Sequence, residues 1–199
     1  MNRESYDAIA PQWDEARLCL SAYEKRILEL LLEHAPTGAH VLDLGCGTGR
    51  PIAEYLVLRQ LHVTGVDQSA AMLQLARSRL PEQRWILSSL ENFEAEREFA
   101  AVIAWDSLFH IPREEHAAIL ARARAVLPPG GRLAITVGGS EHPAFTDTML
   151  GHTFFYDSHS PDEAIALLIG LRFRIIHSEF LNLPTAGRDK GRFAIVAEA

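Results

Sequence analysis

The sequence predicts a doubly wound α/β fold, with a mostly parallel sheet and helices on both of its faces. Short apolar segments of strand length alternate along the chain with longer segments whose apolar residues repeat at helical spacing. Residues 99–105 are all apolar, as expected for a strand that is covered on both faces. A glycine-rich turn follows the first expected strand, residues 40–44. With 199 residues, the chain is expected to form a single domain, residues 1–199.

In the first half of the chain, proline and capping residues mark where the helices begin and end. Pro51 suits a first helical turn, because its missing N–H leaves no hydrogen bond unmade there, and this helix is expected to run toward Arg59. Ser69 is a good N-cap for the next helix, which is expected to end at Pro81. The strands of this half are expected at residues 40–44, 61–66 and 84–87.

In the second half, an apolar stripe that includes Ile119 and Ala123 predicts a helix that ends at residues 128–131, Pro-Pro-Gly-Gly. Pro161, followed by two acidic residues that favour the positive end of a helix, opens another helix, which ends at Gly170. The strands of this half are expected at residues 99–105, 132–137, 173–180 and 192–197. A further helix is expected within residues 1–36, before the first strand. Its apolar face is expected to hold Leu20, Tyr23, Ile27 and Leu31.

The composition argues against several classes of protein. A net charge of −7 does not suit a protein that binds the phosphates of nucleic acid, because that role needs a surplus of Lys and Arg. No apolar run approaches the ~20 residues that span a bilayer. The two cysteines, Cys19 and Cys46, are too few for a disulfide scaffold. We therefore expect a cytoplasmic protein that binds neither nucleic acid nor a membrane.

The glycine-rich turn, residues 41–50, reads VLDLGCGTGR and departs from both common phosphate-binding loops. A dinucleotide loop of the G-x-G-x-x-G type would place its third glycine where this chain has Arg50. No Gly-Lys-Ser/Thr follows, so the pattern of a nucleoside-triphosphate loop is absent too. The alternative, a tight turn between strand and helix with no ligand, stays open.

Two carboxylates indicate which ligand this turn would hold. Asp43 lies inside the turn motif, where it would repel a pyrophosphate and suit a cationic group. Asp67 ends the second expected strand, 20 residues after Gly47, where an acidic residue commonly binds both hydroxyls of a ribose. A nucleoside with a ribose, a positive charge and no phosphates fits both positions, and S-adenosyl-L-methionine is such a compound.

Three motifs carry a resemblance to a known family: the glycine-rich turn, VTGVDQSAAML at residues 63–73 and LPPGGRLAIT at residues 127–136. In these motifs the chain is similar to class I S-adenosylmethionine-dependent methyltransferases. The resemblance is to the small bacterial enzymes of the ubiquinone-biosynthesis-like type. It implies a Rossmann-like sheet of seven strands, with residues 192–197 as an antiparallel seventh strand between the fifth and sixth. It also implies methyl transfer to a small molecule, with S-adenosyl-L-homocysteine as the second product.

The resemblance assigns cofactor-binding roles to individual positions. The methionyl part is expected against Asp43 and the turn, the ribose against Asp67, and the adenine near Met72 and Leu90. Residues 1–36 are expected to act as a lid through Tyr6 and Trp13. The full set comprises Tyr6, Trp13, Asp43, Gly45, Cys46, Gly47, Asp67, Gln68, Met72, Ser89, Leu90 and Trp105. For Met72, Trp105, Tyr6 and Trp13, ordinary packing in the core or on the domain is the alternative.

His110 is the candidate catalytic residue. It follows the fourth expected strand, and an imidazole that titrates near neutral pH suits a general base. Asp106 is a second candidate. A structural histidine is the alternative, because methyl transfer from a sulfonium mainly requires positioning of the nucleophile and exclusion of water.

Residues 138–160 are too long for an ordinary connection, and we expect them to form a wall of the acceptor site. The cationic side chains of residues 187–192 would attract an anionic acceptor. The alternative is that this segment forms only a solvated turn. Acceptor-binding candidates are Phe109, His152, Tyr156 and Arg188. No metal site is expected, because no metal-ligand spacing is present. A macromolecule methyltransferase and a non-methylating protein that binds the same cofactor are the alternatives, and the sequence leaves the oligomeric state open.

Overall fold

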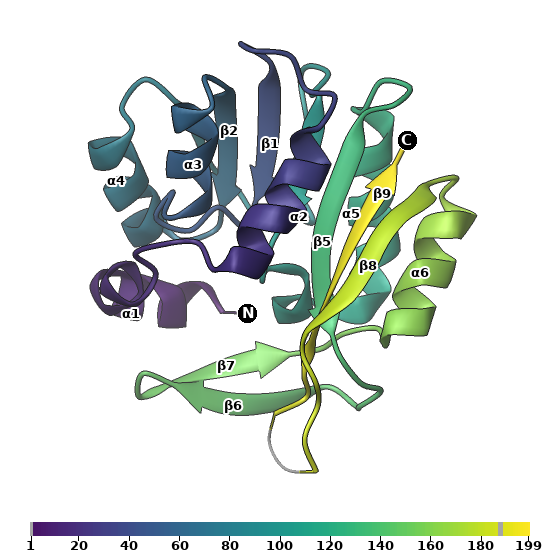
Figure 1. The fold of residues 1–199 in the computed structure, drawn as a ribbon. Coiled ribbons are helices and arrows are strands. Elements are labelled where there is room, and N and C mark those ends of the chain that lie inside the picture. The colour runs from purple at the N-terminus through teal and green to yellow at the C-terminus, as the bar shows by residue number, and fades with distance from the viewer. Residues whose placement is uncertain (1, 187–188) are drawn as a thin grey trace.

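The computed structural model describes residues 2–186 and 189–199, and a seven-stranded sheet forms its centre (Figure 1). The strands are β1 (His40–Leu44), β2 (His62–Asp67), β3 (Arg84–Leu87), β4 (Ala101–Ala104), β5 (Arg132–Gly138), β8 (Arg174–Asn182) and β9 (Arg192–Glu198). Their order across the sheet is β3-β2-β1-β4-β5-β9-β8. The first five pair in parallel, and β9 is antiparallel to both β5 and β8. The predicted fold class and the antiparallel seventh strand are confirmed.

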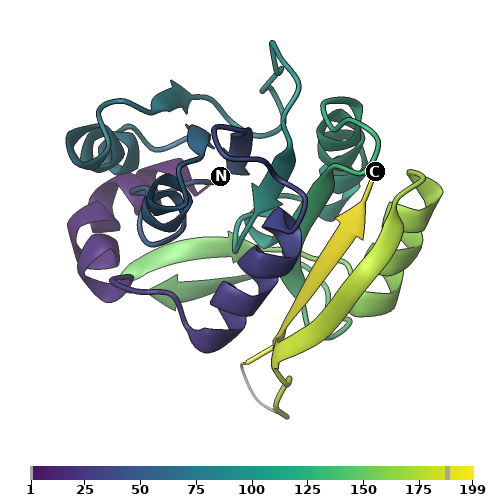
Figure 2. The ribbon, with the colours of Figure 1, turned by 45° about the horizontal axis from the view of Figure 1, so that its top comes forward.

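Helices cover both faces of this sheet (Figures 1 and 2). The helices α2, α3 and α4 pack on one face, and α5 and α6 pack on the other. The remaining helix, α1, lies across the carboxyl ends of β1 and β2. The bounds are α1 (Arg3–Ala16), α2 (Ala22–Leu32), α3 (Ile52–Leu58), α4 (Ala70–Arg79), α5 (Arg113–Ala125) and α6 (Pro161–Gly170), with one 3₁₀ turn, η1 (Leu108–His110). Every helix in the described part of the chain is too short or too polar to cross a membrane.

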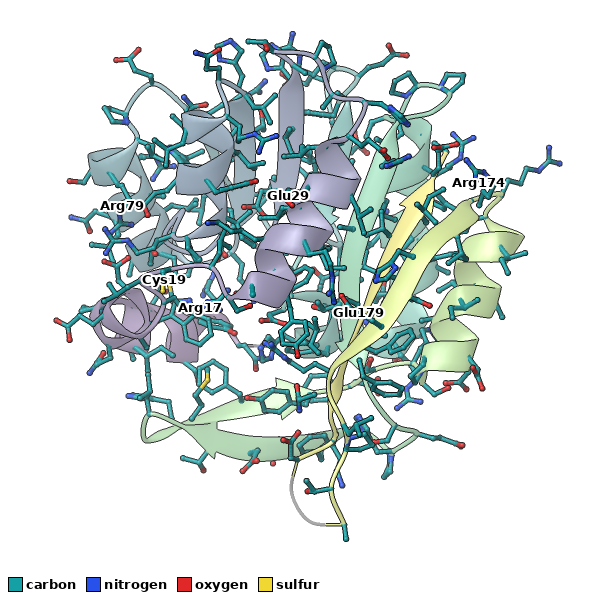
Figure 3. The ribbon with its side chains drawn as sticks, in the orientation of Figure 1. Arg17, Cys19, Glu29, Arg79, Arg174 and Glu179 are labelled. Carbon is teal, nitrogen blue, oxygen red and sulfur yellow. The ribbon has the colours of Figure 1, made fainter. Side chains whose placement is uncertain are left out.

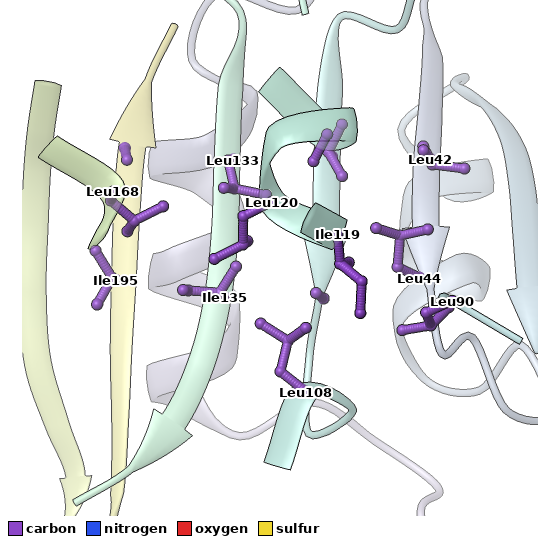
Figure 4. Close-up of a cluster of buried hydrophobic side chains, with 14 of the residues drawn as sticks. Leu42, Leu44, Leu90, Leu108, Ile119, Leu120, Leu133, Ile135, Leu168 and Ile195 are labelled. Atoms are coloured by element: carbon purple, nitrogen blue, oxygen red, sulfur yellow. The ribbon is translucent and has the colours of Figure 1, made fainter. Parts of the chain in front are cut away.

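Alternation of side chains along each strand divides the core into two layers. In β1, Val41 packs with the helices α2 and α3, whereas Leu42 packs on the opposite face. Leu120 of α5 is buried against this second face, next to Leu133 and Ile135 of β5 (Figure 4). Since both faces are covered, the central strands are apolar at nearly every position, which explains the uninterrupted apolar runs in the sequence.

The helix before the first strand differs from its prediction. It begins at Ala22, because Ser21 forms a capping box with Glu24, so Leu20 precedes the helix. Tyr23 is 50% exposed, and the predicted apolar face is therefore wrong at this position. Glu24 is buried instead, since its carboxylate accepts hydrogen bonds from Arg17 and Trp105. The predicted strand 99–105 is also shorter, and comprises only β4.

Residues 138–160 contain a β-hairpin made of β6 (Phe145–Met149) and β7 (His152–Tyr156). The hairpin lies below the carboxyl ends of the parallel strands, beside α1 (Figure 1). Phe154 is fully buried and packs with Ile9 of α1 and Met72 of α4. The insertion therefore joins α1 at the edge of the sheet where the parallel strands end.

Candidate functional site

A cavity of about 470 Å³ lies where β1, β2 and β4 end, and we call it the main cavity. Ligands of doubly wound sheets bind at this edge, because loops from neighbouring strands diverge there. The helix α1 forms its roof. The main cavity is lined by Tyr6, Trp13, Arg17, Asp43, Gly45, Cys46, Gly47, Arg50, Ile52, Asp67, Gln68, Met72, Leu90, Glu91, Asn92, Trp105, Asp106, Ser107, His110, Ile111, Pro112 and Glu115.

The glycine turn after β1 forms one wall of the main cavity. Gly45 has a φ of 83°, and a Cβ at this position would lie 2.3 Å from the Cβ of Ser107. Only glycine satisfies both conditions, since other residues rarely adopt a positive φ and all of them carry a Cβ. The N–H of Gly47 donates to Oδ2 of Asp67 over 2.9 Å, and the hydroxyl of Ser107 donates to the carbonyl of Leu44 over 2.8 Å. These contacts tie the ends of β1, β2 and β4 together.

Asp43 and Asp67 both face the main cavity, at the ends of adjacent strands. Asp43 is 2% exposed, and in the part of the chain that the structure describes no group donates a hydrogen bond to its carboxylate. Burial raises its pKa to about 7, and the nearby Asp67 adds to this rise. Burial also raises the pKa of Asp67, although the N–H groups of Gly47 and Ser69 donate to it and oppose the shift. The pair therefore favours a ligand that brings a cation and hydroxyl donors.

The roof helix α1 is held at both of its ends. Asp7 accepts hydrogen bonds from the Ser69 hydroxyl and the Ala71 N–H at the start of α4. Asp14 forms an ion pair of 2.7 Å with Arg79 at the other end of α4. Figure 3 shows Arg79 on α4 and Arg17 just beyond α1. This double attachment closes the cavity on the side of α4.

Tyr6 and His110 form a hydrogen-bonded pair in the wall under this roof. The Tyr6 hydroxyl lies 2.7 Å from Nε2 of His110. Oδ1 of Asn2 accepts from the Phe155 N–H, so the Asn2 amide nitrogen faces Nδ1 of His110 at 2.9 Å. Nδ1 also lies 3.1 Å from the carbonyl oxygen of Phe155, so a donor and an acceptor both lie next to it. The hydrogen bond between Nε2 and the Tyr6 hydroxyl joins the two side chains in the wall of the main cavity.

Burial moves the pKa values of both members of this pair away from their usual ranges. It lowers the pKa of His110 to about 4. The hydrogen bonds with Asn2 and Tyr6 come from segments more than 100 residues away in the chain, and no local pattern indicates them. Burial also raises the pKa of Tyr6 well above its usual range. Both groups are neutral at pH 7.

Charged side chains line the far end of the main cavity. Arg17 pairs with the buried Glu24 at 2.7 Å, and the indole N–H of Trp105 donates to the same carboxylate. Asp106, which adopts a φ of 50°, pairs with Arg192 at 2.7 Å. Sequence reasoning missed Arg17, because it lies between two helices and only the tertiary fold directs it toward the strand ends.

Most of the residues predicted to bind the cofactor, and also His110, line the main cavity. Ser89 does not appear in its wall. Phe109 and Tyr156 line a separate cavity of about 400 Å³ beside the hairpin, which we call the hairpin cavity. His152 is exposed at the start of β7 and lines neither cavity. Arg188 lies outside the described residues.

Several lining residues had no binding role assigned to them from the sequence. Glu91 and Asn92 follow β3, and Ile111, Pro112 and Glu115 follow β4. Their position after parallel strands is the only feature that could have indicated them. Across residues 2–186 and 189–199, no group of three or more His, Cys, Asp or Glu side chains is placed to hold a metal ion.

Comparison with known proteins identifies the domain. Residues 41–131 match a family model described as a methyltransferase domain. The chain is 37% identical over 130 residues to a trans-aconitate 2-methyltransferase of Azoarcus sp., a match that covers 63% of this chain and 50% of that protein. A demethylmenaquinone methyltransferase of Thermotoga maritima is 33% identical over 138 residues, with 65% and 58% covered. The chain thus spans about half the length of the curated relatives it matches.

Solved structures share the fold. A 1,6-didemethyltoxoflavin-N1-methyltransferase of Burkholderia thailandensis, solved with S-adenosylhomocysteine, superposes with a TM-score of 0.72 at 21% identity, over 98% of this chain and 86% of that one. A methyltransferase structure from Methanosarcina mazei gives a TM-score of 0.73 at 20% identity, over 91% and 98%. Residues 41–131 thus resemble a methyltransferase domain, and the sheet that contains them has the fold of these methyltransferase structures.

Proposed function

We propose that this protein transfers the methyl group of S-adenosyl-L-methionine to a small-molecule acceptor. The observation that carries the proposal is the pair of buried carboxylates, Asp43 and Asp67, which face one cavity beside a glycine turn. This pair repels phosphates and offers partners for an ammonium group and a ribose diol. The named activities of the relatives, methyl transfer to trans-aconitate and to demethylmenaquinone, support a small acceptor.

The lining residues divide among the parts of this cofactor. Asp67 would accept hydrogen bonds from both ribose hydroxyls, and Met72 and Leu90 would contact the adenine from two sides. Asp43 and the backbone at Trp105 would hold the ammonium group, while Arg17 supplies positive charge for the carboxylate. The remaining candidates that line the cavity are Tyr6, Trp13, Gly45, Cys46, Gly47 and Gln68.

The chemistry requires little from the protein beyond geometry. A lone pair of the acceptor attacks the methyl carbon, the carbon–sulfur bond breaks, and its electron pair goes to sulfur. The roof helix excludes water from this reaction, and the walls hold the reacting atoms in line. We also place the reaction in the cytoplasm, a proposal that the two free cysteines, Cys19 and Cys46, support.

Transfer of labelled methyl tests the proposal. The protein is incubated with methyl-labelled S-adenosyl-L-methionine and either a pool of small metabolites, total RNA or a protein extract. We expect label only in the small-molecule fraction, and a rise in melting temperature with S-adenosyl-L-homocysteine, which stabilises the native state by mass action. Label in RNA or protein would identify a macromolecule methyltransferase instead. Binding without transfer in all three pools would contradict the proposed activity.

The affinity for S-adenosyl-L-homocysteine is expected to rise with pH up to about 7. The ammonium group pairs with the Asp43 carboxylate, and burial holds the pKa of Asp43 at about 7, so at lower pH a proton must leave before the pair forms. The association constant should therefore rise by up to about tenfold per pH unit below 7 and level off above it. Calorimetric titrations from pH 5.5 to 8.5 measure this slope. In Asp43→Asn the affinity should be lower and its slope smaller; an unchanged slope would contradict this role.

His110 enters the proposal as a positioning residue rather than a base. Its ring is hydrogen-bonded to the Tyr6 hydroxyl and so holds that hydroxyl in the wall of the main cavity. We expect His110→Ala to lower kcat by about tenfold or more, in line with the loss of a buried hydrogen bond, and to change the affinity for S-adenosyl-L-homocysteine much less. His110→Gln, which keeps an N–H donor, should recover part of the loss. The pH profile of kcat checks this role. If the wild-type profile has an inflection between pH 6 and 7 and this inflection disappears in His110→Gln, then His110 acts as a base.

A further inference from the structure

The carboxylate of Glu24 joins three segments of the chain behind the wall of the main cavity. Its Oε2 accepts a hydrogen bond from the Ser21 N–H at 2.8 Å, which belongs to the N-terminal cap of α2. Its Oε1 accepts from Nη2 of Arg17 at 2.7 Å and from the indole N–H of Trp105 at 3.2 Å. Arg17 and Trp105 line the main cavity, whereas Glu24 does not. One carboxylate oxygen thus serves the helix cap, and the other holds two residues of the cavity wall.

A helix cap alone does not explain the burial of Glu24. The helix α6 has the same capping box, made by Ser160 and Glu163. The carboxylate of Glu163 accepts from the N–H and the hydroxyl of Ser160, and its side chain is 49% exposed. The side chain of Glu24, by contrast, is 4% exposed. A buried carboxylate loses its hydration and needs donors in place of water, and Arg17 and Trp105 supply them.

Glu24 is ionised near neutral pH. Burial raises the pKa of this carboxyl, but hydrogen bonds from Ser21 and Arg17 outweigh that effect and hold the pKa below its usual range. A charged acceptor strengthens the hydrogen bonds that it receives. A second carboxylate near Arg17, that of Asp106, pairs instead with Arg192 at 2.7 Å. The ion pair between Arg17 and Glu24 therefore persists under physiological conditions.

The direction of the Arg17 side chain depends on this ion pair. Arg17 directly follows α1, and the next two side chains, Leu18 and Cys19, are exposed, so they do not fix the linker that leads to α2. Among the described residues, the guanidinium of Arg17 binds Glu24 through Nη2, which leaves the N–H groups of Nε and Nη1 for a ligand. A long side chain that is already held in place loses less freedom when a ligand binds.

We propose that Glu24 is a positioning residue, which directs the Arg17 guanidinium at the α-carboxylate of the cofactor and so selects nucleosides that carry this group. Glu24 does not contact the ligand, and the two carboxylates use different edges of one planar guanidinium. The inference rests on the proposed function, because it takes S-adenosyl-L-methionine as the ligand of the main cavity. It adds a specificity: the site should reject the decarboxylated form of the cofactor, although that form keeps the adenine, ribose, ammonium and sulfonium groups.

Two product analogues test this selection. S-adenosyl-L-homocysteine carries the α-carboxylate, whereas 5′-deoxy-5′-(3-aminopropylthio)adenosine lacks it and keeps the adenine, ribose and ammonium groups. In calorimetric titrations the wild-type protein should bind the first compound at least about tenfold more tightly, the loss expected for one hydrogen bond between charged groups. Equal affinities for the two compounds would overturn the inference. Failure to bind either compound would instead contradict the proposed function.

Variants of Glu24 and Arg17 locate the effect. Glu24→Gln should lower the preference for S-adenosyl-L-homocysteine to nearly that of Arg17→Met, because the guanidinium loses its charged partner and turns toward solvent. The same change in the Arg17→Met background should lower the preference no further, since Glu24 acts through Arg17. A wild-type preference in folded Glu24→Gln, an equal loss of affinity for both compounds, or a further loss in the double variant would overturn the inference.

Two more variants separate selection from folding. Glu163→Gln removes the same capping contact from α6 and lines neither cavity, so it should lower the melting temperature and leave the preference unchanged. A preference lost in this control would overturn the inference. If Glu24→Gln does not fold, Glu24→Asp takes its place. Its charge is kept, but its carboxylate is withdrawn by one methylene from Arg17, so the preference should again fall; a wild-type preference would contradict the proposed role of Glu24.

Discussion

Replacement of Asp67 by alanine is expected to lower the affinity for S-adenosyl-L-homocysteine by about a hundredfold or more. The carboxylate would accept hydrogen bonds from two ribose hydroxyls, and bonds to a charged group contribute roughly 1.5–3 kcal/mol each. Asp67 also accepts from the N–H groups of Gly47 and Ser69. The substitution therefore removes ligand contacts and loosens the glycine turn at once. Calorimetry, together with the rise in melting temperature on ligand addition, measures the loss.

Two further variants separate binding from folding in this experiment. Asp67→Asn keeps one acceptor oxygen, so its affinity should fall between those of the wild-type protein and Asp67→Ala. Asp7→Ala removes a carboxylate of α1 that accepts hydrogen bonds from the first residues of α4. Asp7 does not line the main cavity. It should lower the melting temperature while changing the affinity much less than Asp67→Ala does. A folded Asp67→Ala protein with wild-type affinity would remove Asp67 from the site.

The second large effect is expected for Gly45→Ala. The backbone at Gly45 has a φ of 83°, and an added Cβ would lie 2.3 Å from the Cβ of Ser107. The left-handed conformation costs about 1–2 kcal/mol for alanine. In addition, the contact with Ser107 forces either the glycine turn or the loop after β4 to shift. Because this turn forms a wall of the main cavity, we expect both a lower melting temperature and a loss of affinity for S-adenosyl-L-homocysteine.

Gly38→Ala is the matched control for backbone strain alone. Gly38 has a φ of 78°, but nothing lies within 4 Å of a Cβ added there, and it lines neither cavity. The strain of about 1–2 kcal/mol should lower its melting temperature by about 2–8 °C for a protein of this size. Its affinity for the ligand should stay unchanged. Equal losses of stability and affinity in the two variants would show that the contact with Ser107 does not matter.

Local patterns in the sequence were sufficient for the order of the strands in the seven-stranded sheet and for the shared position of Asp43 and Asp67, but they indicated neither the β6–β7 hairpin nor the two separate helices α1 and α2. Periodicity of apolar residues indicates strands and helices without knowledge of distant neighbours. Asp43 and Asp67 end successive strands of a parallel sheet, and the carboxyl ends of such strands meet at one edge. Their shared cavity therefore followed from the chain order alone, and the structure places both there.

Other features depended on contacts between segments that are distant in the chain. The sequence could not indicate that Asn2 and Tyr6 enclose His110, so the lowered pKa of about 4 was not predictable. The burial of Glu24 likewise depends on Arg17 and Trp105, which donate hydrogen bonds to its carboxylate.

The sequence by itself determined the doubly wound fold, the glycine turn and the acidic residues that follow its strands, because each depends on residues close together in the chain. Only the tertiary structure decided the ionisation of His110, the closure of the main cavity by α1 and the existence of the hairpin cavity. Desolvation, ion pairing and enclosure act through space, and they arise only when distant segments pack against one another.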